Sequence, residues 1–192
     1  MKSPERMKTD LDGLVRIVES RRTERPFVVA IEGIGGSGKS TLAAHLALAL
    51  NDSAVVPMDD FLIKETILDR RNENHYDLLR VEREVLNPFT QGLPFSYRRL
   101  NWKTNGLEPI PGMIDSTLVI LEGICAYHPS LQPYAELRVW VATPPGEAIR
   151  RGRERDADNE NIDYWGIWRN CDVAYCAEFD PSGRADVIVS GV

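Results

Sequence analysis

The strongest chemical signal in the chain is a glycine-rich segment between residues 33 and 38. Glycine has no side chain, so its backbone can adopt left-handed conformations and approach an anion closely, with successive N–H groups directed at phosphate oxygens. The segment fits the first part of the P-loop pattern G-x-x-x-x-G-K-S/T. The residues predicted to cradle phosphates are Gly33, Gly35, Gly36, Ser37 and Gly38.

Three polar residues complete the pattern. Lys39 can reach the β and γ phosphates of a nucleotide, and the hydroxyl of Ser40 suits a magnesium ion. Thr41 follows and is expected to support the same phosphate site. The alternative is a glycine-rich turn that binds nothing. The apolar strand predicted at residues 27–31 and the helix predicted at 42–50 instead favour binding of a nucleoside triphosphate.

Acidic residues follow two other apolar segments. In an open parallel sheet, ligands bind beyond the carboxyl ends of the strands. Asp59 and Asp60 follow residues 54–58, and Glu122 follows residues 118–121. Asp59 is the candidate general base, because a carboxylate near the γ-phosphate can accept the proton of an attacking hydroxyl.

Each of these acids has a structural alternative. Asp59 or Asp60 can cap the N-terminus of a helix, and Asp60 is the better candidate for that role. Glu122 can hold magnesium through water or orient the acceptor of the phosphoryl group, or it can simply accept hydrogen bonds from loop amides.

The only dense basic run of this acidic chain lies at residues 150–156, with the sequence RRGRERD. If it closes over the nucleotide, its arginines can neutralise charge that develops on the transferred phosphoryl group. Arg151 and Arg155 are the candidates for that contact. The alternative is a solvated helix face with pairs such as Arg150 and Glu154.

Residues 61–115 form a long connection, and connections of this length are usually functional. Its aromatic and polar side chains can stack on an acceptor molecule or hydrogen-bond to it, although aromatic residues more often lie in a core. The region offers Phe61, His75, Tyr76, Asp77, Arg80, Tyr97, Arg98, Arg99 and Trp102. Together with Asp59, the residues predicted to bind the acceptor are Phe61, Tyr76, Tyr97 and Arg99.

The elements that position these residues indicate an α/β fold. Short apolar segments predict five buried parallel strands flanked by helices, at residues 27–31, 54–58, 116–122, 137–142 and 185–190. Helical spacing predicts an amphipathic helix over residues 9–21 and a helical stretch over 77–89. We expect one P-loop domain over residues 1–192, with an N-terminal helix and linker (1–25), an acceptor-binding region (61–115) and a lid (147–160).

The composition of the chain limits the classes of partner that we expect it to bind. The 192 residues carry a net charge of −6, which argues against nucleic acid as the main partner. The three cysteines form no C-x-x-C pair, which suits a reducing compartment. The absence of a long apolar run argues against a membrane partner, so a soluble cytoplasmic protein is expected, with a homo-oligomer left open.

These motifs together resemble the uridine kinase and phosphoribulokinase family of P-loop kinases. After the P-loop, the family's D-x-F-Y segment is matched by Asp59-Asp60-Phe61, and its E-G-I segment by Glu122-Gly123-Ile124. The family's arginine-rich lid is matched by residues 150–156, and its A-D-x-I/V strand by Ala185-Asp186-Val187-Ile188. The resemblance extends from about residue 27 to the C-terminus.

The resemblance implies phosphoryl transfer from ATP, with Mg²⁺, to a hydroxyl of a small molecule, and a nucleoside is the first candidate. The sequence departs from the family in the acceptor half. Leu62 replaces the tyrosine of D-x-F-Y, an H-P-x-x-F/L-D segment is reduced to His75-Tyr76-Asp77, and no histidine loop is visible around residues 97–103. The family also phosphorylates pantothenate, ribulose phosphate, glycerate and nicotinamide riboside.

One alternative is a nucleotide-dependent switch or assembly ATPase that acts on a protein partner. The other is a degenerate module that binds nucleotide without catalysis. The presence of Lys39, Ser40, Asp59 and Glu122 disfavours the degenerate module. A pocket for an acceptor beside Asp59 would favour a kinase over a switch.

Overall fold

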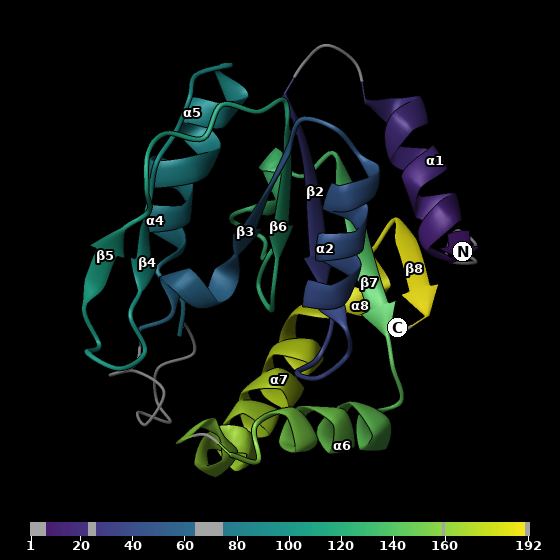
Figure 1. Ribbon diagram of the computed structural model, residues 1–192. Helices are drawn as coiled ribbons and strands as arrows, with labels where there is room; N and C mark the ends of the chain where they lie inside the picture. The colour runs from purple at the N-terminus through teal and green to yellow at the C-terminus, as the bar shows by residue number, and fades with distance from the viewer. Residues whose placement is uncertain (1–6, 23–25, 64–74, 159, 191–192) are drawn as a thin grey trace.

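The computed structural model describes residues 7–22, 26–63, 75–158 and 160–190. Figure 1 shows a central twisted sheet with helices on both faces and at one end. Six strands form this parallel sheet in the order β1-β8-β7-β2-β6-β3. They are β1 (Met7–Thr9), β2 (Phe27–Glu32), β3 (Ser53–Pro57), β6 (Leu118–Glu122), β7 (Leu137–Ala142) and β8 (Val187–Ser190).

The α/β class is therefore confirmed, but the predicted count of five strands is wrong. The five predicted strands form, and β1 adds a sixth beside β8. A helix was predicted from residue 9, whereas α1 spans Leu11–Arg21 because the Asp10 carboxylate caps it, accepting from the N–H of Gly13 at 2.9 Å. The capped start leaves the three preceding residues extended and free to pair with β8.

Alternate residues of the central strands point to opposite faces, and each face has its own core. On one face, α1 and α2 (Lys39–Ala49) cover the sheet with apolar side chains such as Leu14 and Leu42. The odd-numbered residues of β2, including Val29 and Ile31, pack there. Val28 and Ala30 pack on the opposite face, as the two-residue period of a strand requires.

The second face is covered by the long region between β3 and β6. Its helical part consists of α4 (Leu78–Val81), a π-helical turn (Glu82–Leu86) and α5 (Asn87–Thr90), which agrees with the predicted helical stretch. A small antiparallel hairpin follows, made of β4 (Arg98–Leu100) and β5 (Leu107–Pro109). In Figure 1 the hairpin lies outside α4, away from the main sheet.

A short 3₁₀ helix, Gln132–Tyr134, precedes β7, and four helical segments of the described residues follow it. They are α6 (Pro145–Arg155), a 3₁₀ turn (Glu160–Tyr164), α7 (Trp165–Phe179) and α8 (Pro181–Arg184). In Figure 1, α6 and α7 lie together beyond one end of the sheet. No helix among the described residues combines the length and the apolar character that a membrane crossing requires.

Candidate functional site

A cavity of about 510 Å³ lies between the P-loop, the ends of β3 and β6, and helices α6 and α7. Five parts of the chain line it. The P-loop contributes Gly35, Gly36, Gly38, Lys39, Ser40 and Thr41, and the ends of the strands contribute Asp59 and residues 122–125. Helix α6 and its C-cap contribute Arg151, Gly152, Arg155 and Asp156, and α7 contributes Trp165, Trp168, Cys171, Asp172 and Tyr175. The long region between β3 and β6 contributes Leu62, His75, Tyr76 and Trp102.

The P-loop adopts conformations that require glycine. Gly36 and Gly38 have φ values of 76° and 99°, in the left-handed region. A β-carbon at Gly36 would also overlap the carbonyl oxygen of Ala148, because the backbone of α6 passes directly over the loop. The loop therefore requires glycine at these positions, both for its backbone conformation and for the close packing of α6.

Two of the residues predicted to bind phosphate, Gly33 and Ser37, do not line the cavity. A β-carbon at Gly33 would stand 2.8 Å from the carbonyl oxygen of Val141 in β7. The Ser37 side chain is buried, and its own carbonyl accepts a hydrogen bond from the Thr143 hydroxyl at 2.8 Å. Gly33 thus packs on β7, and Ser37 is bonded to the residue that directly follows β7.

Lys39, Ser40 and Glu122 come together at the cavity, as the sequence predicted. The Lys39 ammonium donates to the carbonyl oxygen of Ile34 in its own loop at 3.1 Å, and the Ser40 hydroxyl donates to Glu122 Oε2 at 3.3 Å. A hydroxyl and a carboxylate side by side form a donor set that fits Mg²⁺, which prefers oxygen ligands. Burial raises the pKa of Glu122, while Lys39 and the Ser40 hydrogen bond oppose that shift.

Asp59 faces the cavity from the 3₁₀ turn Met58–Phe61 that follows β3. Its side chain is accessible to the cavity, yet enclosure by the surrounding protein raises its pKa, against the opposing charges of Lys39 and Arg155. Proton transfer to Asp59 is thereby favoured over transfer to an ordinary exposed aspartate. The location matches the predicted position beside the P-loop.

The capping alternative for Asp60 is wrong. The 3₁₀ turn starts after Pro57 and no side chain caps it. Asp60 instead accepts a hydrogen bond from the Tyr97 hydroxyl at 3.2 Å, and Arg80 donates to its backbone carbonyl at 2.6 Å. Asp60 thus joins the turn to the long region rather than to a helix end.

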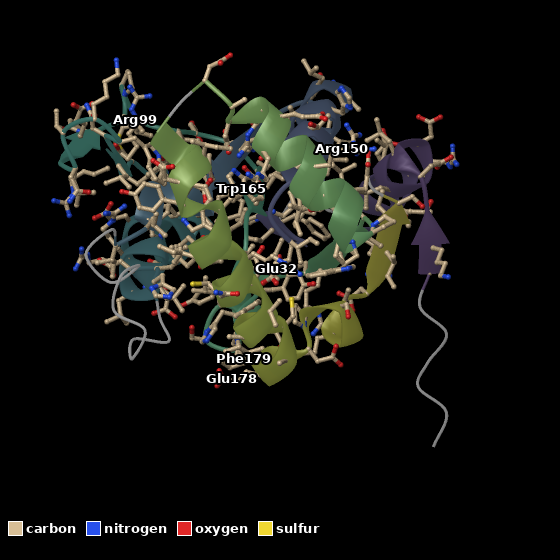
Figure 2. The ribbon with its side chains drawn as sticks, turned by 90° about the horizontal axis from the view of Figure 1, so that it is seen from below. Glu32, Arg99, Arg150, Trp165, Glu178 and Phe179 are labelled. Atoms are coloured by element: carbon tan, nitrogen blue, oxygen red, sulfur yellow. The ribbon has the colours of Figure 1, made fainter. Side chains whose placement is uncertain are left out.

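The arginines of residues 150–156 do not all face the same way: two line the cavity, and one lies on the solvated face of α6. Arg151 and Arg155 line the cavity, the first paired with Glu147 at 2.7 Å and the second with Asp156 at 2.8 Å. Arg150 pairs with Glu154 at 2.7 Å on an exposed face of α6, where Figure 2 labels it. An exposed pair of this kind contributes little to stability.

Three of the residues predicted to bind the acceptor do not line the cavity. Phe61 lies in the core, stacked on Tyr97 with ring centroids 5.3 Å apart and covered by the Arg80 guanidinium at 4.6 Å. Burial of a large aromatic ring is strongly favourable, and the turn that exposes Asp59 directs Phe61 inward. Arg99 is exposed on β4, and Figure 2 shows it at the edge of the molecule.

Tyr76, the remaining predicted aromatic, does line the cavity, together with its neighbour His75 and with Trp102. Asp77 is used structurally, because its carboxylate caps α4 by accepting from the Arg80 N–H at 3.0 Å. Arg80 is buried and donates to the carbonyl oxygens of Asp60 and Arg98. The long region therefore supplies an aromatic wall, and its charged residues fasten the region to the core.

Sequence reasoning missed the α7 side of the cavity. Trp168, Cys171, Asp172 and Tyr175 recur at i, i+3, i+4 and i+7, a spacing that puts four residues on one helix face. The apolar and charged residues of 165–179 are mixed, so the sequence alone does not mark this face as part of a site. The contact with the P-loop is direct, since the Gly35 N–H donates to Asp172 Oδ2 at 2.7 Å.

Glu32, the last residue of β2, was also missed. Its Oε1 accepts hydrogen bonds from the Tyr127 N–H at 2.8 Å and from the Tyr175 hydroxyl at 3.0 Å, so it ties α7 to the strand before the P-loop. Figure 2 shows Glu32 beside α7. Its Oε2 is buried with no hydrogen-bond partner within the described ranges. Burial raises the pKa of Glu32 to about 8.

Curated proteins and solved structures are similar to this chain, although no family model matches it. A uridine kinase of Ureaplasma parvum is 26% identical over 163 residues, covering 77% of this chain and 79% of that protein. A structure described as a possible uridine kinase from Bacillus stearothermophilus superposes with a TM-score of 0.72 at 18% identity, covering 93% of this chain and 96% of the other. A putative fructose transport system kinase from Silicibacter sp. TM1040 superposes with a TM-score of 0.66 at 22% identity, covering 94% and 98%.

The six-stranded parallel sheet with its P-loop gives the chain the α/β fold of these two solved structures. The curated relatives support the resemblance to uridine kinase-like P-loop kinases that the motifs indicate.

Proposed function

We propose that the chain transfers the γ-phosphoryl group of ATP to a hydroxyl of a small uncharged molecule with a flat ring, a nucleoside first of all. The observation that carries the proposal is the continuity of the cavity. One cavity contains the P-loop residues Lys39 and Ser40, the carboxylate of Asp59, and an aromatic wall that includes Tyr76 and Trp102. A kinase needs these three parts within reach of one another.

In the proposed reaction, the P-loop N–H groups and Lys39 hold the triphosphate. Ser40 and Glu122, which are hydrogen-bonded to each other, would hold Mg²⁺, and the ion would neutralise charge on the phosphate oxygens. Arg151 and Arg155 approach from α6 and stabilise the charge that develops on the transferred group.

Asp59 acts as the general base. The acceptor oxygen forms a bond to the γ-phosphorus while the bond from that phosphorus to the β,γ-bridging oxygen breaks and ADP leaves. The proton of the acceptor hydroxyl passes to the Asp59 carboxylate, whose pKa is raised by burial. Because the base must be ionised, turnover should fall as Asp59 becomes protonated.

The lining of the cavity supports an uncharged, planar acceptor. Leu62, Tyr76, Trp102 and Trp168 pack together beside Asp59, and the rings of Trp102 and Trp168 lie 6.4 Å apart in an edge-to-face arrangement. Aromatic and aliphatic walls favour a flat ring over a phosphate or a carboxylate. The carboxylate of Asp59 disfavours an anionic acceptor further.

The test is ADP release from ATP and Mg²⁺ with a panel of acceptors and a control without acceptor. The panel contains pyrimidine and purine nucleosides, nicotinamide riboside, fructose, pantothenate, glycerate and ribulose phosphate. Stimulation by a nucleoside is expected. Stimulation only by an anionic acceptor would contradict the acceptor class, and hydrolysis independent of every acceptor would instead support a switch ATPase.

A further inference from the structure

Asp172 places a carboxylate on the phosphate-binding loop itself. Its Oδ2 accepts a hydrogen bond from the Gly35 N–H at 2.7 Å, and both residues line the cavity. The N–H groups of a P-loop are the groups that hold nucleotide phosphates. An ionised carboxylate offers oxygen acceptors and a negative charge, as phosphate does. Asp172 therefore occupies an anion position of the loop.

The contact belongs to a larger attachment of α7 to the loop. One turn further along α7, the Tyr175 hydroxyl donates to Glu32 Oε1 at 3.0 Å. One turn before Asp172 on the same helix, Trp168 lines the cavity. The Trp165 indole lies 3.4 Å from the position that a β-carbon on Gly35 would occupy. These contacts fix α7 beside the loop, so they also fix the position from which the Asp172 side chain reaches the Gly35 N–H.

Charge makes the same position unfavourable for a second anion. Burial raises the pKa of Asp172, the Gly35 hydrogen bond and the charge of Lys39 oppose that shift, and the repulsion by Asp59 adds to it. A triphosphate that reaches for the Gly35 N–H meets a carboxylate already bonded there. Two anions that approach the same N–H group in a partly buried site repel each other more strongly than they would in water.

We propose that Asp172 competes with nucleotide phosphate for the Gly35 N–H, so that nucleotide binding requires its carboxylate to withdraw from the P-loop. Trp168 and Cys171 lie on the same helix face and line the cavity, so withdrawal also reshapes the wall that faces the acceptor. Asp172 is a positioning residue in this account. The inference rests on the nucleotide binding in the proposed function.

The variant that isolates the charge is Asp172→Asn. The amide oxygen of asparagine can still accept from the Gly35 N–H, and the negative charge is removed. We expect the affinity for ATP and for inorganic tripolyphosphate to rise by about tenfold, which corresponds to about 1.4 kcal/mol. Tripolyphosphate has no base or ribose, so it reports on the phosphate cradle alone.

The measurement is isothermal titration calorimetry of the full chain with Mg²⁺ and no acceptor. Glu178→Gln is the matched control, because Glu178 is an exposed acid near the far end of α7, where Figure 2 labels it. It should leave both affinities unchanged. Thermal melting first establishes that each variant folds, and Asp172→Ser replaces Asp172→Asn if the latter does not.

Tighter binding of both probes by the Asp172 variant, with the control unchanged, supports the inference. Equal or weaker binding of tripolyphosphate overturns it and leaves the kinase proposal standing, because the wild-type chain still binds ATP. If the wild-type chain and the variant both fail to bind ATP, the proposed function fails, and the inference fails with it.

Discussion

Asp59 combines two properties that a general base needs. It faces the cavity that contains Lys39, and burial raises its pKa above that of an exposed aspartate. We predict that Asp59→Asn lowers turnover by roughly 10²- to 10⁴-fold, the range for loss of a general base, and leaves ATP affinity nearly unchanged. Steady-state kinetics with the active acceptor and calorimetry with ATP measure the two quantities.

The pH dependence gives a separate check on Asp59. Because only the ionised carboxylate can accept the proton, wild-type turnover should rise with pH through a pKa higher than that of an ordinary aspartate. The residual activity of Asp59→Asn should lack this rise. A variant that keeps wild-type turnover would show that Asp59 is not the base.

Glu32 should make the stability of the fold depend on pH. Its pKa is about 8 in the folded protein against an ordinary value of 4.5, so the folded state keeps a proton that the unfolded chain has lost. The free energy of unfolding therefore falls as pH rises between these two values and levels off above pH 8. We predict that Glu32→Gln removes this fall and is more stable than wild type at pH 9, on the order of 2–4 kcal/mol.

Urea denaturation at pH 5, 7 and 9 measures the effect. In the Glu32→Gln variant, the amide oxygen can keep both hydrogen bonds that Glu32 Oε1 accepts, so the two proteins should converge at low pH. Parallel stability profiles would mean that Glu32 stays ionised in the folded protein, with its charge balanced by Lys39 and Arg184.

At the level of residues, the sequence predicts the parts of the site that are local in the chain. Lys39 and Ser40 are recognisable because their roles depend on immediate neighbours in the loop. Asp172 and Glu32 are not, because each acquires its role only through a contact between distant segments. Phe61 was assigned to the acceptor, since composition alone does not say whether an aromatic ring faces a core or a cavity.

Glycines allow α6 to pack closely on α7 and on the P-loop. The Trp165 indole packs where a β-carbon of Gly152 would be, and its Nε1 donates to Asp156 Oδ2 at 2.9 Å. Gly36 likewise leaves room for the backbone of α6 at Ala148. Close packing therefore holds α6 to both the P-loop and α7, so a larger side chain at either glycine should displace α6.

We predict that Gly152→Ala destabilises the chain by about 1–3 kcal/mol, because the added methyl group overlaps Trp165 and forces the two helices apart. Gly146→Ala on the same helix is the control. A β-carbon there meets nothing within 4 Å, so this variant should be neutral or more stable by up to about 1 kcal/mol. Urea denaturation compares them, and equal stability of the two variants would contradict the packing argument.

The sequence predicts those strands that are buried on both faces of the sheet. The strands β2 and β6 are buried along their whole length, and their apolar runs mark them without any knowledge of the fold. β1 has three residues and is exposed at two of them, so it gives no apolar signal. Its existence depends on pairing with β8, a partner near the other end of the chain.

At the scale of the molecule, the order of strands determines where ligands can bind. β2 lies between β6 and β7, and the chain leaves β2 through α2 toward β3 on one side before it returns to β7 on the other. Connections that diverge on the two sides of β2 open a crevice beyond its carboxyl end. The P-loop, Asp59 and α7 meet in that crevice, so nucleotide binding should draw together elements from most of the chain.

We therefore predict that MgATP stabilises the whole fold. A ligand that binds only the folded state at about 100 times its Kd adds about 2.7 kcal/mol. For a chain of this length that corresponds to a rise in Tm of about 5–10 °C. Differential scanning calorimetry measures the shift. Lys39→Ala should abolish most of it, because the ammonium group that contacts the phosphates is lost. An equal rise in Tm for both proteins would place ATP outside the P-loop.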